Sequence, residues 1–159
     1  MKYDFPKIDL HLHLDGSMLP ESAWEMAKER GVKMPADNLE DFKKFIVVTA
    51  DCTSVNEYLE KFELPLQIMQ DKEAIKRTAK ELVLLLSSQG LVYAEIRFAP
   101  QLHTRKGLTQ ADSIDAVLEG VNEGMKEAAE AGRPIDIGVI CCAMSIGTAD
   151  VNKEENLET

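Results

Sequence analysis

The sequence predicts an α/β fold, namely the N-terminal part of a (β/α)8 TIM barrel with about three strands and extra helices between the first two. Three segments have strand patterns, and helices ending at glycine lead by short junctions into the second and third, as in parallel α/β units. The second strand has a polar face, and the first ends in a histidine-rich motif. Both features favour a barrel over an open sheet, because barrel enzymes keep their sites at the carboxyl ends of the strands.

The three predicted strands differ in their side-chain patterns. Residues 7–14 alternate strictly between polar and apolar side chains, and we expect the apolar set to pack under the helices: Leu10, Leu12 and Leu14. Residues 91–99 also alternate, with a polar face that we expect to be structural: Tyr93, Glu95 and Arg97. Residues 135–144 are more uniformly apolar, which is typical of a strand covered on both faces.

Capping signals and apolar stripes predict four helices. Pro20 suits the first turn of a helix that ends before Gly31. Residues 54–57 have the pattern of a capping box, opening a helix whose apolar side is Val55, Tyr58, Leu59, Phe62 and Leu66. Two further helices carry continuous apolar stripes and end at Gly90 and Gly132.

The length of 159 residues fits one modest domain or a piece of a larger one. After Met144 the sequence becomes polar and acidic, and no closing element follows. Three strands cannot close a barrel, which requires about eight. We therefore expect residues 1–159 to form a partial metal-dependent hydrolase barrel domain that is truncated at the C-terminus. Its open sheet edges predict self-association.

Composition disfavours two classes of partner. Acidic residues outnumber basic ones, 28 against 18, and the formal net charge of −10 repels nucleic acid and anionic membranes. No apolar run approaches the roughly 18 residues of a membrane span, and the N-terminus lacks the apolar region of a signal peptide. We expect a cytoplasmic protein, in which Cys52, Cys141 and Cys142 stay reduced and pack as small apolar side chains.

The sharpest chemical signal is the run His11-Leu12-His13-Leu14-Asp15-Gly16. Residues i and i+2 of a strand project from the same face about 6.6–6.8 Å apart, so both imidazoles can reach one ion. Neutral imidazole suits zinc, and a zinc ion with an open position generates hydroxide near neutral pH. An isolated pair of histidines on an exposed strand is more often merely solvated, but the turn signal that follows this pair favours a metal role.

Two ligands are too few, because a catalytic zinc ion takes three protein ligands and water. The only other histidine is His103, which could be the third ligand, although a loop or substrate-facing position is the preferred interpretation. Three other signatures are absent: the cysteine-ligated deaminase motif, the phosphate-binding loop and the serine hydrolase elbow.

Residues 11–17 resemble the opening of adenosine deaminases in the amidohydrolase superfamily. Further segments resemble that family in the same order along the chain. They are the helix that covers the pocket (56–65), the second and third barrel strands (92–100 and 140–144) and the start of the next helix (154–159). The resemblance covers essentially the whole chain. One departure is Ser145, in the short stretch after the third strand where the family usually has an arginine.

The resemblance implies roles for particular residues. His11 and His13 are the first two zinc ligands, and His13 also lies near the substrate. Asp15 binds the ribose 5′-hydroxyl, and Gly16 shapes its turn. An apolar lid covers the purine and consists of Val55, Tyr58, Leu59 and Phe62. Periodicity alone leaves a lid and an ordinary core equally open for these four, and the resemblance favours the lid.

The implied function is zinc-dependent hydrolytic deamination of adenosine or deoxyadenosine to inosine and ammonia by the full-length enzyme. The catalytic residues belong to later strands and none lies in this chain, so we expect the fragment to be inactive. One alternative is a related purine or modified-nucleoside deaminase. Asp15 favours adenosine, because relatives that act on other purines tend to have glutamate there. The alternative of another class is an inactive, truncated binding or assembly module.

Overall fold

The computed structural model describes residues 5–144. The predictions for residues 145–159, including Ser145 and the start of the next helix, lie outside the described residues. The elements follow in this order: β1 (Lys7–His13), the short 3-10 helix η1 (Asp15–Ser17), α1 (Pro20–Glu29), α2 (Leu39–Ile46), α3 (Val55–Glu60), α4 (Glu63–Ile68), α5 (Lys72–Ser88), β2 (Leu91–Phe98), the 3-10 helix η2 (Pro100–His103), α6 (Gln110–Glu130) and β3 (Asp136–Cys141).

The three strands form one parallel sheet in the order β1-β2-β3. In β2 the alternation predicted from the sequence is confirmed for Ala94, Ile96 and Phe98, which are buried beneath the helices, whereas Val92 at the start of the same face is 42% exposed. The opposite face of β2 is polar and half-buried, and there the Tyr93 hydroxyl donates to Glu95 over 3.2 Å. A parallel sheet with one polar face and one helix-covered face agrees with the expected barrel fragment.

The prediction that all the leucines of the first strand pack under the helices is wrong for Leu10, which is 55% exposed. Leu14 is fully buried and Leu12 is half-buried. The pairing of β1 with β2 has a register irregularity between Asp9 and Leu12, and β1 is an edge strand. A strictly alternating pattern predicts that one whole face of the strand is covered by helices, and both features disturb that regular burial. The other edge strand, β3, is also incompletely covered, although its apolar composition predicted burial on both faces.

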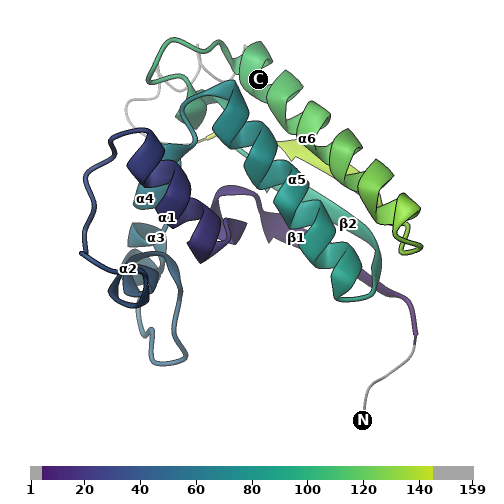
Figure 1. Cartoon of the computed structure of the whole chain (residues 1–159), viewed down its shortest axis with the longest axis horizontal. Coiled ribbons are helices and arrows are strands. Elements are labelled where there is room, and N and C mark those ends of the chain that lie inside the picture. The colour runs from purple at the N-terminus through teal and green to yellow at the C-terminus, as the bar shows by residue number, and fades with distance from the viewer. Residues whose placement is uncertain (1–4, 145–159) are drawn as a thin grey trace.

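Helices α5 and α6 lie side by side over one face of the sheet, and the shorter helices gather beside α5 (Figure 1). The core lies between this helical layer and the strands. Two glycines of α6 allow the close approach of α5. A Cβ atom on Gly120 would overlap the Lys76 carbonyl oxygen, and one on Gly124 would lie 2.8 Å from Cβ of Val83.

Polar side chains cap the first turns of four helices. The side chains of Asn38, Asp71 and Thr109 accept hydrogen bonds from backbone amides in the first turns of α2, α5 and α6. Ser54 caps α3 in the same way, but the reciprocal bond of the predicted capping box is absent between Ser54 and Glu57. The segment after Ser54 forms two short helices, α3 and α4, where the periodicity predicted one. Helix α2 was not predicted.

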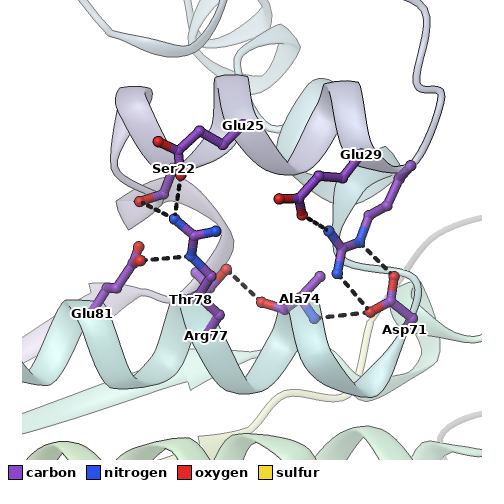
Figure 2. Close-up of polar contacts among 9 residues, drawn as sticks. Ser22, Glu25, Glu29, Asp71, Ala74, Arg77, Thr78 and Glu81 are labelled. Carbon is purple, nitrogen blue, oxygen red and sulfur yellow. Dashed lines mark hydrogen bonds and ion pairs between the residues drawn. The ribbon is translucent and has the colours of Figure 1, made fainter.

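Two arginines join α1 to α5 (Figure 2). Arg77 on α5 binds Glu25 of α1 at 2.7 Å and Glu81 at 2.8 Å. Arg30, just after α1, binds Asp71 through Nε at 2.6 Å and through Nη2 at 3.0 Å. Asp71 also accepts from the Ala74 amide, so one carboxylate both caps α5 and holds the end of α1. These contacts hold α1 against α5.

Within residues 5–144, no helix is long and apolar enough to span a membrane. The three cysteines are unpaired, as predicted, and each is half-buried.

Candidate functional site

The histidine motif lies at the carboxyl end of β1, next to the carboxyl end of β2. His13 pairs in register with Arg97, and the Leu14 amide donates to the Arg97 carbonyl over 2.9 Å. The chain then turns at once into η1, and the Ser17 hydroxyl donates to the His13 carbonyl over 2.5 Å. Leu14 is fully buried and anchors the turn in the core. The fold thus places both imidazoles at the edge of the sheet where barrel enzymes carry their sites.

The two imidazoles come together. The ring centroids of His11 and His13 are 5.5 Å apart, and the ring planes are inclined by 53°. Two imidazoles bound to one tetrahedral zinc ion, with Zn–N distances of about 2.0–2.1 Å, have centroids roughly 5 Å apart. Burial lowers the pKa of His13, which favours the neutral form that binds metal. The spacing of the two rings and the lowered pKa of His13 therefore fit a zinc ion.

A complete metal site is not present in the described part of the chain. Among residues 5–144, no group of three or more His, Cys, Asp or Glu side chains could hold a metal ion. His103, considered as a third ligand, is fully buried at the end of η2, and its Nδ1 lies 2.8 Å from the Met69 carbonyl oxygen. His11 and His13 thus stay predicted ligands that require at least one more donor.

Arg97 makes a contact that the sequence did not predict. Its Nη1 atom lies 3.4 Å from both ring nitrogens of His11, and its Nε donates to Sγ of Cys142 over 3.3 Å. The guanidinium therefore lies between the end of β1 and the segment after β3. The pairing of the two strands would have indicated that Arg97 lies near the histidines, because Arg97 stands opposite His13 on the polar face.

Asp15 is the most buried polar group of the motif, with 5% of its surface exposed. Its Oδ1 accepts from the Gly16 amide over 3.1 Å. Burial raises the pKa of the Asp15 carboxyl, and the neighbouring His103 and His13 oppose that rise. A buried carboxyl group that keeps a free acceptor position can take a hydrogen bond from a hydroxyl group.

Phe62 links the expected lid to the motif. Its ring meets His13 edge-to-face with centroids 5.8 Å apart and contacts Tyr58 at 5.3 Å. A Cβ atom on Gly16 would lie 2.8 Å from Cε1 of Phe62, so only glycine allows this approach. The other lid residues are exposed: Val55 by 73%, Leu59 by 55% and Tyr58 by 41%. In the described chain these side chains are not core.

The family profile described as adenosine deaminase matches residues 6–158. The chain is 42% identical over 152 residues to an adenosine deaminase from Haemophilus ducreyi, covering 96% of this chain and 42% of that protein. It is 41% identical over 121 residues to an adenosine deaminase from Clostridium acetobutylicum, covering 76% of this chain and 36% of that protein. The chain thus spans about two fifths of the length of these curated relatives.

Solved structures share the fold. The ADAL–IMP complex matches with a TM-score of 0.69 at 24% identity, covering 94% of this chain and 44% of that one. An adenine deaminase from Arthrobacter aurescens matches with a TM-score of 0.67 at 20% sequence identity, covering 86% of this chain and 39% of that one. An amidohydrolase from Burkholderia ambifaria with bound Zn matches with a TM-score of 0.66 at 20% sequence identity, covering 86% of this chain and 35% of that one. The described α/β fragment with its parallel sheet is consistent with part of their barrel. The profile match and the sequence identities show that this chain belongs to the adenosine deaminase family.

Proposed function

We propose that this chain is the N-terminal part of a zinc-dependent enzyme that deaminates adenosine or deoxyadenosine. In the reaction, water adds to the purine carbon that carries the amino group, the C–N bond breaks, and ammonia leaves together with inosine from adenosine or deoxyinosine from deoxyadenosine. The observation that carries the proposal is the convergence of His11 and His13, with ring centroids 5.5 Å apart, directly before the buried Asp15. The family membership supports it.

Each motif residue has a distinct part in this proposal. His11 and His13 hold the zinc ion together with donors from the rest of the protein. Zinc supplies Lewis acidity that makes water nucleophilic near neutral pH. Asp15 accepts a hydrogen bond from the ribose 5′-hydroxyl, and Gly16 lets Phe62 approach the pocket. Phe62 and the exposed Val55, Tyr58 and Leu59 cover the purine and exclude water.

The buried carboxyl of Asp15 favours a nucleoside over a nucleotide. A 5′-phosphate would bring its negative charge next to a carboxyl group that has little access to screening water. ADAL, a fold relative, has been crystallised with the nucleotide IMP. We therefore propose that this enzyme differs from such relatives in rejecting substrates with a 5′-phosphate.

Turnover by the complete protein that contains this chain tests the proposal. Release of ammonia is followed with adenosine, deoxyadenosine, adenine, AMP and N6-methyl-AMP at equal concentration. We expect the highest kcat/KM for adenosine or deoxyadenosine, and at least about a hundredfold lower value for AMP. A preference for free adenine or for a nucleotide would contradict the proposed substrate and support the alternative of a related purine deaminase.

Residues 1–159 alone form a separate test. We propose that this isolated partial barrel domain is inactive and self-associates through the edges of β1 and β3, where Ile8, Leu10 and Ile140 are exposed. Size-exclusion chromatography and a deamination assay with added zinc check both points. A monomeric fragment would contradict the association, and turnover would contradict the inactivity. The cytoplasmic location remains part of the proposal, and fractionation of cells that produce the protein tests it.

A further inference from the structure

His103 and Asp15 follow two neighbouring strands at the same edge of the sheet. Asp15 comes two residues after the end of β1, and His103 ends the short helix η2 that follows β2. Because β1 and β2 are parallel and adjacent, their carboxyl ends lie together. Both side chains are buried, with 5% of Asp15 and none of His103 exposed. The fold therefore brings two buried ionisable groups to one place.

One nitrogen of His103 has a fixed partner and the other has none. Nδ1 lies 2.8 Å from the Met69 carbonyl oxygen, which can only accept, so Nδ1 carries a hydrogen. Nε2 is buried and has no hydrogen-bond partner in the described structure. An unsatisfied buried nitrogen is costly, and such groups often mark a functional contact. The ring of Phe98, with its centroid 5.7 Å away, packs against the imidazole and limits its movement.

A second buried side chain fastens the His103 segment. The Gln70 amide nitrogen donates to the carbonyls of Leu66 (2.6 Å) and Leu102 (2.9 Å), and its amide oxygen accepts from the Arg105 amide over 2.9 Å. These bonds hold the backbone on both sides of His103 against the end of α4, which also contacts η1. Such support keeps a site residue in one orientation and reduces the entropy lost on binding.

We propose that His103 is a positioning residue that orients the Asp15 carboxyl group toward the ribose 5′-hydroxyl through one bridging water molecule, which donates one hydrogen bond to Nε2 of His103 and the other to the carboxyl group. Burial lowers the pKa of His103 and raises the pKa of Asp15, and each of the two groups opposes the shift of the other, which agrees with their proximity. One carboxyl oxygen already accepts from the Gly16 amide. A contact with His103 would fix the rotation of the carboxyl group and leave an acceptor position for the substrate.

This inference rests on the proposed function, because it assigns His103 to the recognition of a hydroxyl that the substrate must possess. It predicts that His103 matters only for substrates with a 5′-hydroxyl. A purely structural histidine would instead affect every substrate alike. Adenosine and 5′-deoxyadenosine differ only in this hydroxyl and therefore separate the two roles.

The test compares His103→Asn with His103→Gln in the complete protein, each alone and combined with Asp15→Asn. Asparagine keeps a donor near the Nδ1 position and lacks an atom at Nε2, whereas glutamine places its amide group near Nε2, where the amide oxygen can accept from the water molecule. For His103→Asn we expect kcat/KM to fall at least about tenfold for adenosine, mainly through KM, and less than about twofold for 5′-deoxyadenosine. His103→Gln should keep most of the adenosine activity, and neither change should matter in the Asp15→Asn background.

Equal losses with both substrates, equal losses in both variants, or a full additional loss in the Asp15→Asn background would overturn the positioning role. Thermal unfolding of each variant identifies a loss that comes from unfolding, in which case the surviving glutamine variant decides the question. If the wild-type protein does not deaminate adenosine at all, the proposed function fails first and the inference falls with it. Normal turnover with substrate-independent effects of His103 overturns the inference alone.

Discussion

The contact between Gly16 and Phe62 gives a direct way to disturb the lid without touching a metal ligand. Gly16 lies in η1 and is not one of the glycines with positive φ, so alanine fits the backbone. Its Cβ atom would, however, lie 2.8 Å from Cε1 and 2.9 Å from Cζ of Phe62. Ordinary carbon contacts are about 3.4–4.0 Å, so the ring must move by at least about 0.6 Å.

The size of the effect follows from the environment of the ring. Overpacking costs about 1–3 kcal/mol, and the half-buried Phe62 can swing outward, which favours the lower end of that range. About 1.4 kcal/mol corresponds to a tenfold change in binding. We therefore expect Gly16→Ala to raise KM for adenosine roughly tenfold. The change in kcat should stay within about threefold, because Phe62 touches His13 only at the ring edge.

Steady-state kinetics of the complete protein measure this effect, with two controls. In the double variant Gly16→Ala Phe62→Leu, the ring atoms that collide with the new Cβ atom are absent. The rise in KM of the double variant should therefore be smaller than the effects of the two single substitutions added together. Gly90→Ala makes the same chemical change where φ is +82° and no atom lies within 4 Å. It should cost about 1 kcal/mol of stability and leave KM unchanged. An unchanged KM in Gly16→Ala would refute the lid contact.

Three predictions concern stability, measured by urea unfolding. Asp71→Ala should cost about 1–2 kcal/mol through loss of the α5 cap and the Arg30 pair; Asp71→Asn keeps most of the cap, so equal losses would contradict this. Gly120→Ala should cost about 3 kcal/mol by forcing α5 from α6, and a loss below about 1 would contradict the packing. Burial lowers the pKa of His103 below its ordinary 6.5. Below pH 6.5 His103 therefore takes up a proton more readily in the unfolded chain than in the folded chain. The free energy of unfolding consequently decreases as the pH is lowered through this range. An unchanged pH dependence in His103→Gln would contradict that cause.

The sequence predicted those parts of the fold in which local pattern and long-range packing agree. Strand β2 pairs with a neighbour on each side, so its alternation matches its burial. Within residues 5–144, strand β1 pairs with β2 alone and has an irregular register, and Leu10 is consequently exposed. The helix expected after Ser54 breaks at residues 61–62, between α3, which has no buried residue, and α4, which is largely buried.

The candidate site divides in the same way. The two histidines and Asp15 are close in sequence, so the period of a strand and a turn signal sufficed to group them. The roles of Arg97, Gln70 and His103 depend on residues far away in the chain, such as His11 for Arg97 and Met69 for His103. No local pattern encodes these contacts, because they arise only when neighbouring strands bring their ends together.

The zinc content of the complete protein tests the central claim most directly. Metal analysis by mass spectrometry compares the wild type with the His11→Ala His13→Ala double variant, and His103→Gln is the matched control. If the paired imidazoles hold the ion, the wild type and the control contain about one zinc ion per chain and the double variant contains almost none. Zinc retained at the wild-type level by a folded double variant, or absent from the active wild type, would contradict the account.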